Sequence, residues 1–251
     1  MELTEEPTLK IRVVLVEPEG EINIGSIARL VKNFNVKEFY IVNPKTQIGA
    51  KAREFAAKAV DVLEKAVICS SLDEALRGVD VSICTSAIIG GSRDVLRHPI
   101  TPNDLRDIVK SYGKIAIVFG RESTGLTRDE IAKCDLLLTI PANPSYPTLN
   151  LSHAVGIILY EVYKVGKVKP LYEVADKHIL ELILKYVGNI IHLLREDSNK
   201  ASRLLISFRR LLFKAIPSIG EAYNILYLMR KINVLLHECK VGGKREDNSN
   251  D

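Results

Sequence analysis

The sequence predicts an α/β protein with a mostly parallel sheet, followed by a small all-helical extension. Up to about residue 163, short β-branched runs alternate with segments whose apolar residues recur at helical spacing. Beyond residue 171 only the helical spacing remains. A chain of 251 residues, 47% of them hydrophobic and 26% charged, can bury a sizeable core. Strands that alternate with helices usually form a parallel sheet covered on both faces.

The first half of the chain begins with a β-branched run at 11–16. In the segment 23–34, Ile24, Ile27 and Val31 recur at helical spacing, which predicts a helix there. The same patterns then repeat along the chain. They predict strands at 39–42, 66–69 and 79–85, and helices at 50–63, 71–77 and 102–110.

The second half of this region contains the clearest buried strand, at 114–119, because that run is almost wholly apolar. Thr127 and Glu130 have the spacing of a capping box, so a short helix is expected from residue 128. A last strand at 136–140 and a last helix at 149–163 complete the α/β unit. Ligand sites in such sheets gather at the carboxyl ends of the strands, which directs attention to the loops that follow them.

The C-terminal part differs from the rest in charge as well as in pattern. Residues 1–165, the predicted α/β domain, contain 20 Lys/Arg and 21 Asp/Glu, a net charge of −1. Residues 166–240 contain 13 Lys/Arg and 7 Asp/Glu, a net charge of +6. We therefore expect residues 170–240 to form a helical, basic extension that binds a polyanion such as RNA. A linker at 165–170 and a disordered polar tail at 241–251 are also expected.

The remaining composition argues against metal, redox and membrane functions. The four cysteines are scattered without a CxxC pair, and the histidines are dispersed. Cys69 and Cys84 lie in apolar runs and are expected to be buried free thiols. No apolar run reaches the roughly 18 residues of a membrane span, and the N-terminus has no signal-peptide pattern. We expect a cytoplasmic protein without a bound metal.

Three loops after strands carry distinctive residues. The first contains Asn23 and Gly25 but neither a GxGxxG motif nor a GK[ST] phosphate loop, and Arg29 lies about two turns into the following helix, within reach of a phosphate or sugar. The second, 119–126, has glycines at both ends of a polar turn. The third, 140–152, contains three prolines that restrict its shape. With no Ser/His/Asp set or metal cluster nearby, hydrolysis is poorly supported.

Taken in order, the motifs resemble those of a known enzyme family. Asn23-x-Gly25-x-x-x-Arg29, then the run from Phe119 to Leu126, then Ile140-Pro141 with residues 149–155, look like the three motifs of the SpoU branch of SPOUT RNA 2′-O-methyltransferases. Within that branch the chain most resembles the TrmJ-type tRNA enzymes. The resemblance covers about residues 10–163 and is much weaker in the C-terminal helices.

This resemblance implies a trefoil knot late in the α/β domain, S-adenosylmethionine as cofactor, and a homodimer. It also implies methyl transfer to a ribose 2′-hydroxyl of tRNA, at nucleotide 32 of the anticodon loop, on cytidine and also on uridine. The family's catalytic positions fall on Asn23, Arg29, Glu122, Asn150 and Ser152. Its cofactor contacts fall on Thr85, Ser86, Ala87, Gly120, Ile140, Pro147, Thr148 and Leu149.

Chemistry and charge refine the expected roles. Arginine is a poor general base because it stays protonated in proteins, so we expect Arg29 to orient the hydroxyl or an adjacent phosphate, with a phosphate or water taking the proton. RNA-contact candidates are Arg93, Arg97 and Arg121 in the strand-end loops, and Arg203, Arg209 and Arg210 in the basic extension.

Other functions remain open at this point. One is a ribosomal RNA ribose methyltransferase of the same branch, and another is an RNA-binding protein that kept the knot but lost catalysis. A nicotinamide dehydrogenase is a distant possibility, because the dinucleotide fingerprint is absent.

Overall fold

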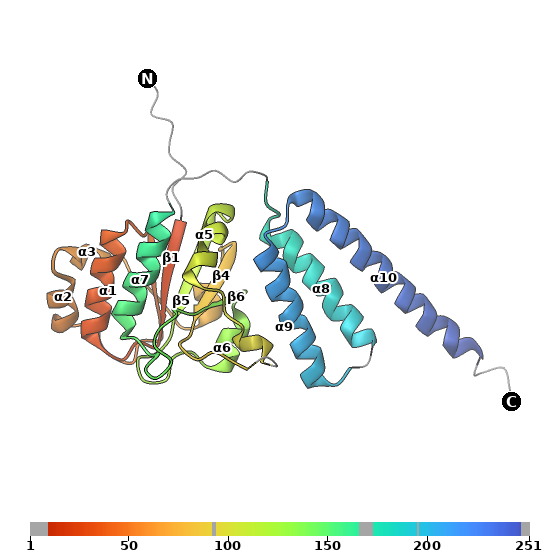
Figure 1. The fold of residues 1–251 in the computed structure, drawn as a ribbon, viewed down its shortest axis with the longest axis horizontal. Coiled ribbons are helices and arrows are strands. Elements are labelled where there is room, and N and C mark those ends of the chain that lie inside the picture. The colour runs from red at the N-terminus through yellow and green to blue at the C-terminus, as the bar shows by residue number, and fades with distance from the viewer. Residues whose placement is uncertain (1–9, 92–93, 166–172, 195, 247–251) are drawn as a thin grey trace, which may run out of the picture. The chain divides into compact units, whose positions relative to one another are not determined.

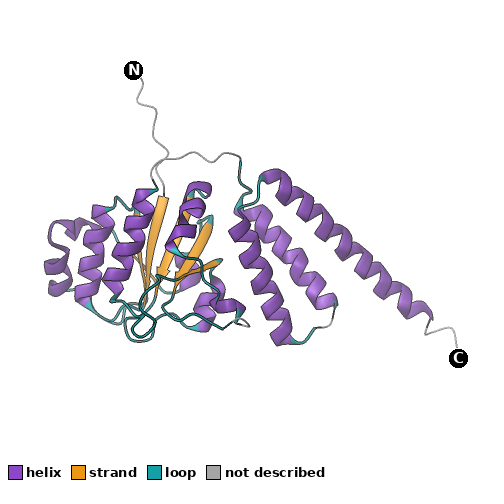
Figure 2. Ribbon diagram, in the orientation of Figure 1, coloured by secondary structure: helices purple, strands orange, loops and turns teal. Residues whose placement is uncertain are grey.

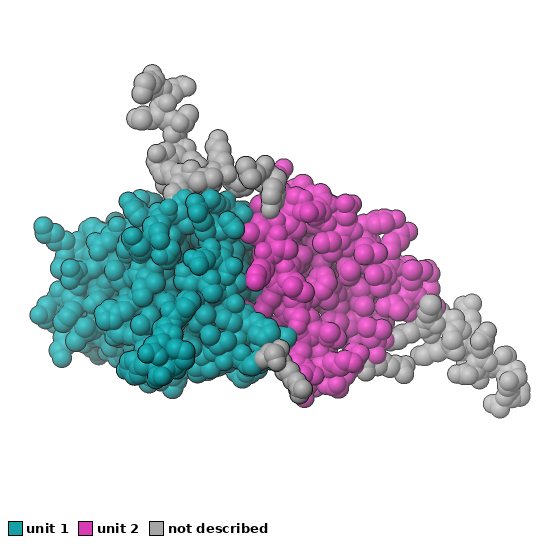
Figure 3. Space-filling model, in the orientation of Figure 1, with its two compact units in different colours: residues 1–170 teal, residues 171–251 magenta. Residues whose placement is uncertain are grey.

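The structure, a computed structural model, describes residues 10–91, 94–165, 173–194 and 196–246, without the side chains of 239–246. The chain divides into two compact units, residues 1–170 and residues 171–251 (Figure 3). Among the described residues, the strands all lie in the first unit and the second contains only helices and loops (Figure 2).

A six-stranded, all-parallel sheet forms the centre of the first unit, in the order β3-β2-β1-β5-β4-β6. β1 (Lys10–Val16) and β5 (Lys114–Phe119) are neighbours at its middle, and both are almost entirely buried. Leu15 pairs with Phe119, so the carboxyl ends of these two strands lie level with each other. The other strands are β2 (Glu38–Val42), β3 (Val67–Cys69), β4 (Val81–Thr85) and β6 (Leu136–Leu138).

Three helices cover one face of the sheet. α7 (Leu151–Lys164) packs against both α1 (Glu21–Asn33) and α5 (Pro102–Ser111) (Figure 1). The buried side chains of α7 recur at helical spacing, as the sequence predicted. The remaining helices are α2 (Ala50–Ala56), α3 (Val60–Glu64), α4 (Leu72–Ala75) and α6 (Arg128–Lys133), with 3-10 turns at Ala57–Ala59 and Val95–Arg97.

The helix expected at 50–63 is interrupted. Ala57 has a φ of +48°, so the chain leaves α2, passes through a 3-10 turn and resumes as α3. The interruption frees the carbonyl of Lys58, which accepts a hydrogen bond from Lys32 Nζ at 2.7 Å. Helical periodicity cannot detect such a break, because an Ala-rich run favours a helix throughout.

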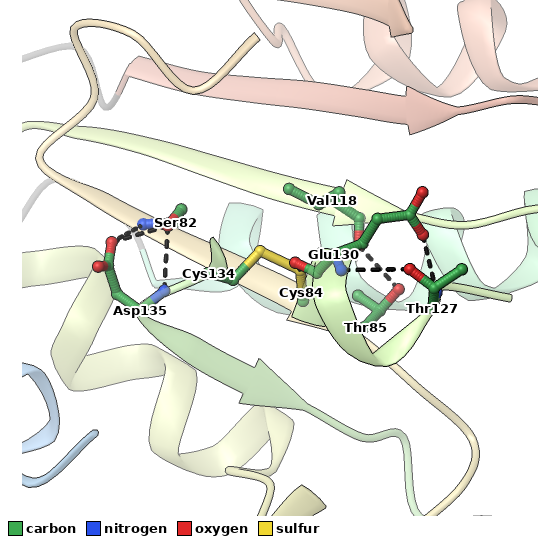
Figure 4. The surroundings of a disulfide bond; sticks show 8 residues. All are labelled: Ser82, Cys84, Thr85, Val118, Thr127, Glu130, Cys134 and Asp135. Carbon is green, nitrogen blue, oxygen red and sulfur yellow. Dashed lines mark hydrogen bonds between the residues drawn. A yellow bond between two sulfur atoms is a disulfide. The ribbon is translucent and has the colours of Figure 1, made fainter. Parts of the chain in front are cut away.

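A disulfide ties β4 to Cys134, which lies between α6 and β6. Cys84 and Cys134 are bonded to each other (Figure 4), so the expectation of a free thiol at Cys84 is wrong. Cys69 is free and buried, as expected. Beside the disulfide, Asp135 Oδ2 accepts hydrogen bonds from the backbone and hydroxyl of Ser82, at 2.9 and 2.7 Å. This pairing could not be predicted from the spacing of the cysteines, because it follows from β4 and β6 being neighbours in the sheet.

The second unit consists of α8 (Lys177–Leu193), α9 (Ser198–Ala215) and α10 (Ile219–Glu246), with α8 packed against both others. Asp176 and Asp197 cap the starts of α8 and α9 by accepting from backbone N–H groups. α10 continues to Glu246, so the first part of the expected polar tail is helical, and the rest lies outside the described residues, as does most of the expected linker. In the described part of the chain no helix is long and apolar enough to cross a membrane.

The predicted fold class is confirmed: an α/β unit with an all-parallel sheet precedes a helical unit. The trefoil knot stays a prediction. The last part of the α/β unit, in which it is expected, contributes residues to the site described next.

Candidate active site

The carboxyl ends of β4, β5 and β6 enclose a cavity of about 210 Å³, together with the start of α7. All eight residues predicted to hold the cofactor line this cavity. They come from three loops that are far apart in the sequence but adjacent in the sheet, because β4 has β5 on one side and β6 on the other. The eight are Thr85, Ser86, Ala87, Gly120, Ile140, Pro147, Thr148 and Leu149.

The loop after β4 is held to both neighbouring strands. Thr85 Oγ1 donates to the carbonyl of Val118 in β5 at 3.0 Å (Figure 4), and Ser86 N donates to the carbonyl of Leu138 in β6 at 3.0 Å. Ser86 Oγ accepts from the backbone N of Ile88 at 3.0 Å. The wall of the cavity is therefore fixed by hydrogen bonds before any ligand binds.

Four of the five predicted catalytic residues form one hydrogen-bonded chain. Asn23 Nδ2 donates to Glu122 Oε1 at 2.9 Å, and Asn150 Nδ2 donates to Asn23 Oδ1 at 3.1 Å. Asn150 Oδ1 in turn accepts from Ser152 N at 2.9 Å and from Ser152 Oγ at 2.7 Å. Asn150 is also the N-cap of α7, so the chain joins the starts of α1 and α7 to the loop after β5.

Glu122 anchors this chain rather than standing free. Its two carboxylate oxygens also accept from the backbone N of Glu19 at 2.8 Å and of Gly20 at 3.1 Å. The same two loops are also joined in the other direction, because the Glu19 carboxylate accepts hydrogen bonds from Ser123 N and Ser123 Oγ. Since donors already occupy both oxygens of Glu122, its carboxylate is better suited to fix two loops than to remove a proton from a substrate.

Arg29, the fifth predicted catalytic residue, lines a separate cavity of about 680 Å³ between α1 and α7. Ser152 and His153 line it too, and Leu149 lines both this cavity and the predicted cofactor cavity. The side chain of Arg29 is exposed and makes no ion pair within the described part of the chain. Its guanidinium is therefore available to a ligand.

A glycine allows α1 to lie where it does. A Cβ added to Gly25 would stand 2.3 Å from the carbonyl oxygen of Ala52 in α2, so only glycine permits this close approach of the two helices. Arg29 lies about one turn further along α1. The glycine of the first motif thus has a packing role that helps place Arg29.

The predicted RNA-contact residues of the first unit lie in different surroundings. Arg97 Nη1 is 3.4 Å from both Ser86 Oγ and the carbonyl of Ile88, and so lies against the loop after β4. Arg121 is engaged by two carboxylates, of Glu17 at 3.0 Å and of Glu130 at 2.9 Å. Arg93 lies outside the described residues.

In the second unit the three predicted arginines all belong to α9. Arg203 is exposed, whereas Arg209 and Arg210 are half-buried. Arg209 Nη1 lies 3.4 Å from Glu181 Oε1 of α8. Of the three, Arg203 is the most accessible to a phosphate.

Charge pairing changes the acidity of the groups around Arg121. Hydrogen bonds from Arg121, and then from Lys45, lower the pKa of Glu17 to about 2. The Glu130 carboxyl is partly buried, which raises its pKa, but the hydrogen bonds from Arg121 and Thr127 outweigh this and leave the pKa lowered. Both carboxyls are therefore ionised at neutral pH and hold the guanidinium as an ion-paired group.

Sequence reasoning missed Glu17, Glu130 and His153 as members of these sites. Glu17 follows β1 directly, a position at which ligand or loop contacts are common, and Glu130 was assigned only to a helix cap. No set of three or more His, Cys, Asp or Glu side chains that could hold a metal ion occurs among the described residues.

Comparisons with known proteins identify a family that covers most of the chain. The family described as the SpoU rRNA Methylase family matches residues 10–160. The tRNA (cytidine-2′-O-)-methyltransferase TrmJ of Sulfolobus acidocaldarius is 47% identical over 230 residues, which span 91% of this chain and 95% of that protein. A protein of the same name from Methanocaldococcus jannaschii is 39% identical over 224 residues, 87% of this chain and 97% of that protein.

A solved structure shows the same fold. The probable methylase family protein from Haemophilus influenzae superposes with a TM-score of 0.62 at 30% identity, over 92% of this chain and all of that chain, a coverage of 100%. A match of 230 residues to the Sulfolobus protein is longer than the first unit, so it includes residues of the helical unit.

Proposed function

Because the chain belongs to the SpoU rRNA methylase family, we propose that it transfers a methyl group from S-adenosylmethionine to a ribose 2′-hydroxyl of tRNA. The observation that carries this proposal is the pair of neighbouring cavities. One is lined by all the predicted cofactor residues, the other contains Arg29 and Ser152, and Leu149 lines both. A methyl donor and an acceptor bound in these two cavities would meet at Leu149.

The residues of the first cavity fit S-adenosylmethionine. Leu126, Leu138 and Ile140 offer an apolar wall for the adenine, while Thr85 and Thr148 add hydroxyls for the polar parts of the cofactor. A sulfonium cofactor supplies an already activated methyl group, so no metal is required for the transfer. The chain's own task is to align the acceptor and to ease the loss of its proton.

Arg29 is suited to hold the acceptor. Its free guanidinium has five donors in a planar fork, which can bind the phosphate next to the reacting ribose and stabilise negative charge that develops on the 2′-oxygen. In the transfer the 2′-oxygen would gain the methyl group while the bond from that methyl to the sulfonium sulfur breaks, leaving a neutral thioether. The hydroxyl proton would pass to a phosphate oxygen or a water. The hydrogen bonds that link Glu122, Asn23, Asn150 and Ser152 hold the start of α7 against the start of α1. They keep Ser152 at the same cavity as Arg29.

The names of the two archaeal relatives, which match most of this chain, support tRNA as substrate and cytidine as the preferred base. We assign nucleotide 32 of the anticodon loop as the target, with uridine as a weaker substrate. The net charge of +6 over residues 166–240 supports a role of the helical unit in holding tRNA. A cytoplasmic location is part of the same proposal.

A homodimer is also part of the proposal. The outward face of α7 exposes Ile157, Tyr160 and Tyr163, at 38, 53 and 62% of their full accessible areas. Large apolar side chains at this spacing form one stripe along a helix, as expected of a surface that a second subunit covers. Sedimentation equilibrium of the full chain tests this assembly.

The test of the function is methyl transfer from labelled S-adenosylmethionine to unmodified tRNA, followed by mapping of 2′-O-methyl groups. Transfer to cytidine 32 supports the proposal, and a C32U transcript measures the acceptance of uridine. Transfer to ribosomal RNA but not tRNA would indicate the other substrate class of the family. Binding of tRNA with neither cofactor binding nor transfer would identify a protein that has lost catalysis.

A further inference from the structure

Arg121 stands out among the predicted RNA-contact residues because four of its five N–H donors are already used. Nε donates to Glu17 Oε2 at 3.0 Å, and Nη2 donates to Glu130 Oε1 at 2.9 Å. Nη1 donates both to Glu130 Oε2 at 3.0 Å and to the carbonyl of Gly125 at 3.1 Å. The contact with Glu130 is therefore the two-pronged arrangement that only arginine can make. We call Glu17, Arg121 and Glu130 the Arg121 cluster.

The Arg121 cluster joins three parts of the first unit. Glu17 follows β1, Arg121 follows β5, and Glu130 lies in α6. Glu130 Oε2 also accepts from the backbone N of Thr127 at 2.7 Å, so the same carboxylate caps α6 and holds Arg121. The three side chains are only 21, 15 and 17% exposed, respectively, so solvent screens their attraction less than that of a surface pair.

Arg121 also closes the loop 120–126 on itself. Its carbonyl accepts from Gly125 N at 2.9 Å while its guanidinium donates to the Gly125 carbonyl. Gly125 has a φ of +68°, and a Cβ on Gly120 would lie 2.3 Å from the carbonyl carbon of Gly125. The loop is thus a tight ring, and every residue from Gly120 to Leu126 lines the predicted cofactor cavity.

The same geometry argues against an RNA contact. The Arg121 guanidinium already donates four hydrogen bonds, which leaves it little capacity to donate to a phosphate. Its single positive charge is matched by two carboxylates, with Lys45 Nζ as a further partner of Glu17 at 3.1 Å. A phosphate approaching this site would have to displace a carboxylate that is already well placed.

We propose that Arg121 is a positioning residue that shapes the S-adenosylmethionine cavity by holding the loop 120–126, and does not bind RNA. This inference rests on the proposed function, because it takes the cavity to be the cofactor site. It assigns Glu17 and Glu130 to the same task, although neither lines the cavity itself.

The experiment compares wild-type protein with Arg121→Gln, Arg121→Lys and Glu130→Gln, in the full-length chain. Cofactor affinity is measured by isothermal titration with S-adenosylmethionine, and tRNA affinity by filter binding over a series of salt concentrations. Arg53→Gln is the matched control, because it also removes an arginine–carboxylate pair, the one with Glu64. Both of these side chains are exposed, and neither lines the cavity. Circular dichroism and thermal unfolding show which variants are folded.

We expect Arg121→Gln to weaken S-adenosylmethionine binding by about tenfold, within the range for residues coupled in one ion-pair network. Arg121→Lys is expected to weaken it nearly as much, because an ammonium cannot make the two-pronged contact. Affinity for tRNA and its salt dependence should stay within about twofold of wild type. The double variant Arg121→Gln/Glu130→Gln should be little worse than either single variant, because both disrupt the same contact.

Three outcomes would overturn the inference or what lies beneath it. If folded Arg121→Gln binds the cofactor like wild type, the positioning role is wrong while the proposed function stands. If instead tRNA affinity and its salt dependence fall with cofactor affinity unchanged, Arg121 is an RNA contact. If the wild-type protein itself binds no S-adenosylmethionine, the proposed function fails first. Should Arg121→Gln not fold, Arg121→Lys and Glu130→Gln decide by the same measurements.

Discussion

Asn150 Nδ2 donates a hydrogen bond to Asn23 Oδ1 at 3.1 Å, although the two residues are 127 positions apart in the chain. This contact links the helix that carries Arg29 to the helix that carries Ser152. It also depends on the amide of Asn23, whose Nδ2 must donate to Glu122 at the same time as Oδ1 accepts. An aspartate at position 23 could accept but not donate.

The first prediction follows from this requirement. Asn23→Asp should lower methyl transfer by about 10² or more, since it places a second carboxylate against Glu122 and breaks the chain that fixes the start of α7. Single-turnover transfer to tRNA measures the effect. Asn35→Asp is the matched control: Asn35 lies just after α1, with a φ of +53° that aspartate tolerates. Equal rates for Asn23→Asp and wild type would contradict the proposed role of these hydrogen bonds.

Arg29 provides a second prediction. Arg29→Ala should reduce methyl transfer by about 10²–10³, the usual cost of removing one well-placed electrostatic group, while S-adenosylmethionine affinity stays unchanged because Arg29 lines the other cavity. Arg29→Lys should also be strongly impaired. Single-turnover rates at saturating cofactor measure the effect, with the exposed Arg106→Ala of α5 as control. Normal rates in both Arg29 variants would remove Arg29 from the active site.

The basic helical unit leads to a third prediction. Arg203→Gln should weaken tRNA binding and reduce the slope of log affinity against log salt by about 1, as expected when one phosphate contact is lost. Arg203 is exposed on α9, so its replacement should leave the fold and cofactor binding intact. Binding measured between low and physiological salt decides the point. An unchanged slope would show that Arg203 does not contact phosphate.

The disulfide provides a fourth prediction, concerning stability. A cross-link between Cys84 and Cys134, separated by 50 positions, should stabilise the fold by about 4 kcal/mol in the chain-entropy treatment. Urea unfolding with and without a reductant measures this difference. In Cys84→Ala/Cys134→Ala the reductant should have no effect. If wild-type stability is insensitive to reductant and all four cysteines titrate as thiols in the unreduced protein, the disulfide is absent from the protein in solution.

Acid stability provides the fifth prediction. The pKa of Glu17 is lowered from its ordinary value of 4.5 to about 2, so in the unfolded chain Glu17 binds its proton more readily than in the folded protein. Its contribution is therefore fully present above about pH 4.5 and lost as the pH falls towards 2. Unfolding free energies of wild type and Glu17→Gln should differ most above that range and converge below it. A difference that does not change with pH would contradict an ionic role for Glu17.

Local patterns in the sequence predicted most of the first unit. The apolar run of β5 and the capping box at Thr127 both appear where expected, because strand burial and helix capping depend on neighbouring residues. The break at Ala57 was not predictable, since it depends on packing between helices rather than on the propensity of an Ala-rich run. The helical unit likewise followed from its periodicity, although α10 extends further than the composition suggested.

The candidate site was predicted from motifs in three separate loops, and the structure brings the residues predicted to hold the cofactor to one cavity. Which polar groups pair there could not be read from the motifs. Arg121 looked like a free cation because the sequence does not show that Glu17 and Glu130 reach it. The motif residues Asn23 and Asn150 looked independent, yet they share a hydrogen bond.

The sequence by itself determined the parallel α/β class, the helical unit and the positions of the family's three motifs. It could do so because periodicity, capping and motif spacing are properties of residues close together in the chain. Only the tertiary structure decided which distant side chains meet: Cys84 with Cys134, Asn23 with Asn150, and Arg121 with two carboxylates. The reason is physical. Strand order sets which loops are neighbours, and hydrogen bonds and ion pairs form only at contact distance. The separation of two residues along the chain does not determine the distance between them in space.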